Sequence, residues 1–182
     1  MSPIGHLVTA SAMAWCYLDL NDIGVLDAGA SMSQAFLDAN DGVFYSHHAI
    51  ALVALGIVLG ARGPDRLEIP TFNWYRRTRQ SLIPHRTLTH WPPFWMFLTW
   101  LAWTGSEHPL DYVGAAWSST FLGFCAGSWL HLAMDIMTPM GIPLLLPFGK
   151  RTSLNIYKTA TLGEGACVAV FLAVLVFFAK TS

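Results

Sequence analysis

A histidine and an aspartate four residues apart close a long apolar segment, in the run His131-Leu132-Ala133-Met134-Asp135. In an α-helix, side chains four positions apart project from one face, so this spacing places an imidazole beside a carboxylate. Both groups bind borderline divalent metals, and both are costly in a membrane unless something there uses them. The pair therefore predicts a metal site, with a hydrogen-bonded helix pair as the alternative interpretation.

Further ionisable residues stand at the ends of the other apolar segments. They are His6, Asp65, His85, Arg86, His90 and Glu164. With His131 and Asp135 they supply four imidazoles and three carboxylates, a donor set that suits zinc better than calcium or magnesium. Each also has an ordinary interpretation: Asp65 as a helix cap, Glu164 as a first-turn acid that favours the helix dipole, and His6 as a hydrogen-bonded core residue.

The composition is that of an integral membrane protein. Of the 182 residues, 54% are hydrophobic and only 12% are charged, which is about half the share usual in soluble domains. The 3 cysteines lie in apolar runs without C-x-x-C spacing, so we expect free, buried thiols. We predict one integral-membrane domain over residues 1–182.

Five apolar segments are expected to form membrane helices, at residues 4–20, 45–60, 91–104, 112–137 and 162–179. The predicted fold is an all-α polytopic bundle with the metal site at the helix ends. Several segments are shorter than the ~20 residues that a perpendicular span needs. The shortest is 91–104, and a re-entrant or interfacial placement of one segment is the alternative.

Basic residues gather in two loops that a five-span topology places on one side of the membrane. The loop between the second and third segments holds six arginines, and the loop between the fourth and fifth holds Lys150, Arg151 and Lys158. The positive-inside rule makes these loops, the N-terminus and the metal site cytoplasmic, as in a bacterial-type inner membrane. The adjacent His47 and His48 fall on the opposite side and are left out of the site. The interleaved aromatic and basic residues at 72–79 are interpreted as topology determinants, and no nucleic-acid partner is expected.

Three motifs carry a family resemblance. Pro64-Asp65, the H-R-T-L-T-H run at 85–90 and the H-L-A-M-D-I-M-T-P-M-G-I-P run at 131–143 resemble the YdjM family of predicted inner-membrane metal-dependent hydrolases, some linked to the LexA-regulated DNA-damage response. The last run is also similar to a segment of zinc-dependent phospholipase C and of single-strand-specific zinc nucleases. The resemblance implies that His131 and Asp135 are zinc ligands, with Asp135 able to bridge two ions. Asp65 and one of His85 or His90 would complete the first site, and His6 would serve a neighbouring one.

Two departures from these patterns limit the size of the cluster. Gly141 stands where the zinc enzymes carry a histidine ligand. Leu67, followed by Glu68, stands where members of the family usually carry an acid. We therefore expect a site for one or two divalent ions, zinc being favoured, rather than three.

The predicted function is a membrane-bound metal-dependent hydrolase that cleaves a phosphate ester of a lipid or small amphiphile. Arg86 would neutralise charge on the phosphate, and Glu164 or Asp65 would act as general base. The loop at 138–148 would wall the site or admit a lipid headgroup. The alternative is a non-catalytic, metal-stabilised membrane protein that acts as a partner or regulator in a stress response. A metal carrier ranks below both, because the ionisable residues gather at one face of the membrane.

Overall fold

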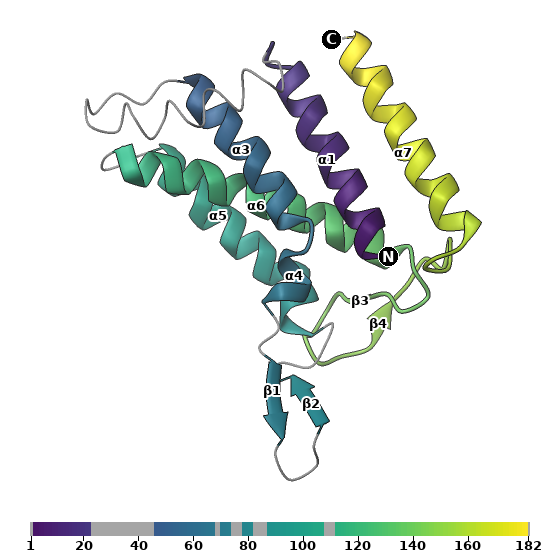
Figure 1. Ribbon diagram of the computed structural model, residues 1–182. Helices are drawn as coiled ribbons and strands as arrows, with labels where there is room; N and C mark the ends of the chain where they lie inside the picture. The colour runs from purple at the N-terminus through teal and green to yellow at the C-terminus, as the bar shows by residue number, and fades with distance from the viewer. Residues whose placement is uncertain are drawn as a thin grey trace.

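The computed structural model describes residues 2–22, 46–67, 70–73, 78–81, 87–107 and 112–181. The described chain is mostly helical, as predicted, and each of the five apolar segments forms a helix (Figure 1). These are α1 (Pro3–Asp19), α3 (Ser46–Gly60), α5 (Pro92–Glu107), α6 (Tyr112–Ile136) and α7 (Leu162–Thr181). A short helix, α4 (Gly63–Arg66), and a 3-10 turn, η2 (Leu88–His90), lie in the connection between α3 and α5.

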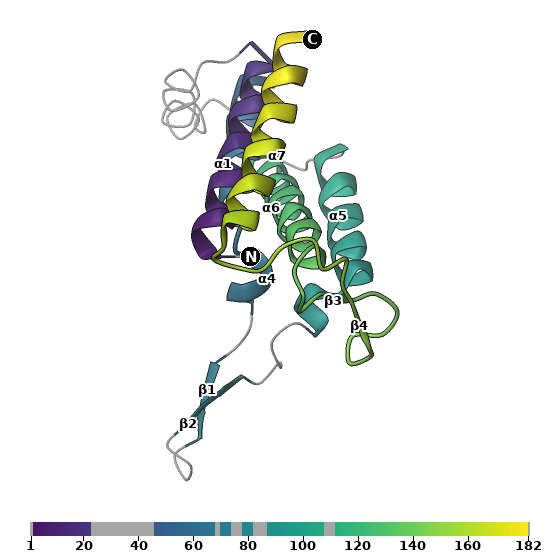
Figure 2. The same cartoon turned by 90° about the vertical axis from the view of Figure 1, so that its right-hand side faces the viewer.

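Two small antiparallel hairpins interrupt the loops, and neither was predicted. Strands β1 (Pro70–Asn73) and β2 (Thr78–Ser81) pair with Pro70 opposite Ser81, and this hairpin projects away from the helices (Figures 1 and 2). Strands β3 (Ile142–Pro143) and β4 (Arg151–Thr152) pair with Ile142 opposite Thr152. The basic side of the protein therefore carries some regular structure beyond the helix ends.

Length and hydropathy together separate α7 from the other described helices. Within the described ranges, α7 alone is both long and apolar enough to count as a candidate membrane span. Helices α1, α3 and α5 contain 17, 15 and 16 residues, fewer than the ~20 that a perpendicular span requires. The five-span topology and the cytoplasmic position of the metal site stay predictions.

Helices α3 and α6 cross at very short distance because glycines line both sides of the contact. A Cβ atom on Gly56 would lie 2.1 Å from the carbonyl oxygen of Thr120. On the facing helix, a Cβ atom on Gly123 would lie 2.0 Å from the oxygen of Val53, and one on Gly127 would lie 2.1 Å from that of Ile57. Small residues four apart are a common means of close helix packing in membranes. This contact brings the end of α3 against the last turns of α6.

The remaining helices assemble around the α3–α6 pair. Helix α5 packs on α6, and α1 packs on both α3 and α7. Alanines at positions 10, 14, 51 and 54 form the buried contact between α1 and α3, in agreement with the close approach expected from the small residues of the first segment. The start of α1, the end of α6, α4 and the start of α7 all lie at one end of the bundle (Figure 1).

Candidate metal centre

Five of the six predicted metal ligands meet at this end of the bundle. His6 comes from the first turns of α1, Asp65 from α4, His90 from η2, and His131 and Asp135 from the end of α6. Their ligand atoms form two overlapping groups, His6 with His131 and Asp135, and Asp65 with His90 and His131. Within each group, all ligand atoms lie within 4.8 Å of one another. Four of the five side chains are buried, whereas the side chain of Asp65 is 35% exposed. These buried groups can hold a metal ion.

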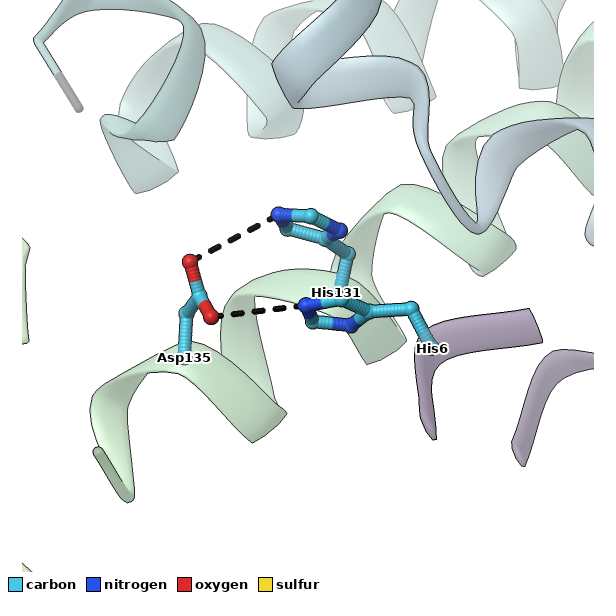
Figure 3. Close-up of side chains that lie close together, drawn as sticks. All are labelled: His6, His131 and Asp135. Carbon is cyan, nitrogen blue, oxygen red and sulfur yellow. Dashed lines mark ion pairs between the residues drawn. The ribbon is translucent and has the colours of Figure 1, made fainter. Parts of the chain in front are cut away.

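The carboxylate of Asp135 lies between the two groups. Its Oδ1 is 3.4 Å from Nε2 of His6, and its Oδ2 is 3.6 Å from Nε2 of His131, as Figure 3 shows for these three residues. Oδ2 is also 3.6 Å from Nε2 of His90. Separations of this size exceed normal N–H···O hydrogen bonds. They are close to the distance of about 3.4 Å between two ligand atoms of a tetrahedral site whose metal–ligand bonds are 2.0–2.1 Å long.

The carboxylate of Asp65 completes the second group. Its Oδ1 lies 3.4 Å from Nε2 of His90 and 3.7 Å from Nε2 of His131. One oxygen of Asp65 and one of Asp135 therefore each lie at ligand-to-ligand spacing from the same two imidazole nitrogens, those of His90 and His131. That donor set fits zinc or another borderline divalent ion.

The orientation of His131 supplies an independent test of fit. Its Nδ1 lies 2.8 Å from the carbonyl oxygen of Ala61, to which an Nδ1–H donates. This bond leaves the lone pair on Nε2, which is buried and has no hydrogen-bond partner among the described residues. A buried acceptor without a partner is costly unless it binds something. A carbonyl that fixes the tautomer in this way is the usual support of a metal-binding histidine.

His90 is held by the segment that precedes α5. The hydroxyl of Thr89 lies 3.2 Å from Nδ1 of His90, which again directs Nε2 into the cluster. The indole of Trp95 donates to the carbonyl oxygen of Thr89 at 2.6 Å and so anchors the same segment to α5. His6 is placed by stacking, with its ring 3.8 Å from that of His131 and nearly parallel to it.

The electrostatics of the centre favour the protonation states that bind metal. Burial opposes ionisation of Asp65, but the close polar contact with His90 and the charge of the neighbouring imidazoles outweigh it and lower the pKa of Asp65 to about 2. Burial is also the main cause that lowers the pKa of His90 below its ordinary value. At neutral pH the carboxylate is charged and this imidazole is neutral, as metal ligation requires.

Of the three other predicted site residues, Glu164 joins neither group. His85 and Arg86 lie outside the described residues. Both carboxylate oxygens of Glu164 accept hydrogen bonds, Oε1 from the backbone and hydroxyl of Ser2 at 2.9 and 2.6 Å, and Oε2 from the backbone of Ala160 at 2.6 Å. Glu164 thus ties the start of α7 to the residue that caps α1, one turn before His6. Its role as general base stays a prediction.

Gly141 has a structural reason to lack a ligand side chain. Its backbone is in the left-handed region, with φ at +58°, and a Cβ atom there would lie 2.2 Å from the carbonyl oxygen of Thr152. A histidine at this position would therefore disrupt the β3–β4 hairpin. The sequence departure that argued against a third ion thus coincides with a turn that has room only for glycine.

The excluded histidine pair lies away from the centre. His48 is fully buried near the start of α3, whereas α4 and the metal centre lie at the opposite end of that helix (Figure 1). The side chain of His47 lies outside the described residues. The placement of His48 agrees with its exclusion from the predicted site.

Three supporting groups were not predicted from the sequence. They are the carbonyl of Ala61, the hydroxyl of Thr89 and the indole of Trp95. A carbonyl leaves no signal in a sequence. Thr89 does leave a signal in the sequence, because it directly precedes a candidate ligand in a segment bounded by prolines.

Replacing Thr89 with valine is expected to lower metal affinity by about 10- to 100-fold, because the outer hydrogen bond that orients His90 is lost while side-chain volume is kept. Titration of the purified protein with a competing chelator measures the change. Thr104→Val is the matched control, since within the described ranges the Thr104 hydroxyl bonds only to carbonyls of its own helix, those of Trp100 and Leu101. Equal affinities in the two variants would contradict the role given to Thr89.

The comparisons with known proteins agree with a membrane setting. A family model described as the YdjM inner membrane protein matches residues 1–181, which is nearly the whole chain. The comparison with curated proteins found no match, and neither did the comparison with solved structures.

Proposed function

Because the chain belongs to the YdjM family of inner membrane proteins, we propose that it is a membrane-bound metal-dependent hydrolase that cleaves a phosphate ester of a lipid or small amphiphile. One observation carries the proposal: five ligand side chains converge, and the carboxylate of Asp135 faces a different imidazole with each oxygen. Carboxylates that bridge in this way are suited to paired ions, which are common in enzymes that cleave phosphate esters.

The proposal assigns the residues to two neighbouring ions, with zinc favoured. The first would be held by Asp65, His90, His131 and Oδ2 of Asp135. The second would be held by His6 and Oδ1 of Asp135. Only two protein atoms are assigned to the second position, which leaves room for water and substrate there, as in catalytic rather than structural sites.

The chain's own residues are proposed to have separate roles in the reaction. A bound divalent ion supplies a Lewis acid for a phosphoryl oxygen and lowers the pKa of a bound water. The buried histidines hold the ions and exclude bulk water. Asp65 is the most exposed of the five ligands, at 35%, so water and substrate are proposed to enter on its side. As general base, Asp65 would use the carboxylate oxygen that does not face the imidazoles, whereas the oxygens of Glu164 already accept three hydrogen bonds. Arg86 is proposed to neutralise charge on the phosphate.

A second candidate function rests on the ligands of the first ion alone. Asp65, His90, His131 and Asp135 are four donors, enough to fill a tetrahedron and close it to substrate. In that case the ion would stabilise the bundle, and the protein would act as a partner or regulator without turnover.

Replacing His6 with alanine separates the two functions. For the hydrolase, the bound metal is expected to fall from two ions to one per chain. Turnover of bis(p-nitrophenyl) phosphate should be lost, while thermal stability changes little. Metal analysis and the colorimetric assay on detergent-purified protein measure both.

Leu7→Ala is the matched control, because Leu7 is the next residue of α1 and is exposed. It should keep both ions and turnover. A wild type that holds one ion, turns over no phosphate ester and is unaffected by His6→Ala would favour the structural function instead.

A further inference from the structure

An apolar hairpin loop follows α6 directly. At the tip of this loop, residues 144–148, the side chains of Leu145, Leu146 and Phe148 are 88%, 66% and 75% exposed. These residues belong to none of the predicted membrane helices, yet their side chains are large and apolar, and such side chains are normally buried. A contiguous exposed apolar patch of this kind usually marks a surface that is covered by a partner or by lipid.

The base of the loop is fixed against the end of α6, next to the metal centre. Ile142 and Pro143 in β3 are buried, and Ile142 pairs with Thr152 in β4. Beyond β4, the backbone of Leu154 donates to the carbonyl of Ile136, the last residue of α6, at 2.8 Å. The indole of Trp91 donates to the carbonyl of Leu145 at 3.3 Å. The exposure of the apolar tip is therefore a property of a fixed hairpin.

The charge around the tip has one sign. No acidic residue occurs between Asp135 and Glu164, whereas Lys150, Arg151 and Lys158 lie in that interval. Figures 1 and 2 place β3 and β4 at the end of the bundle where α6 ends and α7 begins, the level of a membrane surface if α7 spans. Apolar side chains followed by cations are the arrangement that enters an anionic interface, with the cations left at the phosphates.

We propose that the apolar tip inserts into the boundary between headgroups and acyl chains of the anionic cytoplasmic leaflet, with Lys150 and Arg151 on lipid phosphates. The occupant is lipid rather than protein, because the tip joins a helix bundle already in the bilayer and its flanking charges complement an anionic surface. Insertion fixes the metal centre at headgroup depth, because Asp135 stands at the end of α6 and only a short turn separates α6 from β3. This would favour a headgroup phosphate ester as the substrate of the proposed hydrolase.

Spin-label accessibility in phosphatidylglycerol-containing proteoliposomes tests the insertion. Single cysteines replace Leu145 and Phe148 in a chain whose Cys16, Cys125 and Cys167 are changed to alanine. Val170 on α7, 64% exposed, is the lipid reference, and the exposed Arg66 is the water reference. Labels at the tip are expected to collide with oxygen more than with a nickel chelate, as at Val170.

Two results would overturn the proposal. Free collision with the nickel chelate, as at Arg66, would mean that the tip lies in water. Protection from both oxygen and nickel would mean that a second copy or another protein covers it. The same pattern is expected in an Asp135→Asn background, so failure of insertion is distinguishable from failure of the metal chemistry.

A second experiment tests the contribution of the two cations. In Lys150→Gln/Arg151→Gln, nickel accessibility at Leu145 is expected to rise in phosphatidylglycerol bilayers, and to stay unchanged in phosphatidylcholine. Equal accessibility with and without the two cations in both lipids would overturn their assignment to lipid phosphates.

Discussion

Replacing Asp135 with asparagine is expected to lower the affinity for divalent metal by more than about 100-fold, the upper end of the loss seen when only an outer support is removed. The change keeps the size of the side chain but removes the negative charge. It also removes one of the two carboxylate oxygens that lie 3.4–3.6 Å from three imidazoles. Both ions of the proposed pair depend on this carboxylate, so both should be lost.

The measurement is metal content after gel filtration of detergent-purified protein, followed by chelator competition. Asp19→Asn is the matched control, because Asp19 is exposed at the far end of α1 and belongs to no ligand group. The control should retain wild-type metal. If Asp135→Asn also retains it, Asp135 is not a ligand and the second ion has no bridge.

Replacing Gly127 with valine is expected to destabilise the protein by about 3 kcal/mol or more, the upper part of the range for overpacked contacts. A Cβ atom there would lie 2.1 Å from the oxygen of Ile57, which is backbone and cannot rotate away. Helices α3 and α6 would have to separate. The carbonyl of Ala61 would then move from His131, so metal affinity should fall as well.

Thermal unfolding in detergent, with and without added metal, measures this effect. Gly165→Val is the matched control, because no described atom outside its chain neighbours and its own helix backbone lies within 4 Å of the position that a Cβ would take there. This variant makes the same substitution in a helix, at a position that no other described helix approaches closely. Similar unfolding temperatures for the two variants would contradict the view that the glycine contact holds the metal centre together.

Regular local structure explains which features of the site were predictable. The i and i+4 spacing of His131 and Asp135 requires only an α-helix, and an unbroken apolar run of this length indicates one. The five helices follow the five apolar segments for the same reason. The charge distribution then separated His48 from the cluster, and the structure places it at the other end of α3.

Irregular segments explain what was not predictable. His90 turns inward because η2, the Thr89 hydroxyl and the Trp95 indole fix the backbone before α5, and such tertiary hydrogen bonds have no periodic signature. Glu164 was placed correctly in the first turn of α7, but its bonds to Ser2, 162 residues away, depend on how α1 and α7 pack. The short β3–β4 pair has too few residues to show an alternating pattern.

The most direct test is the metal content of the wild-type protein, purified in detergent without an affinity resin that carries metal and measured by mass spectrometry. The convergence of five ligands, with a buried and unpartnered Nε2 on His131, predicts at least one tightly bound divalent ion per chain. Two ions would agree with the proposed hydrolase. Protein that is folded, free of metal as purified and unable to take up zinc, manganese or iron would contradict a metal centre at this site.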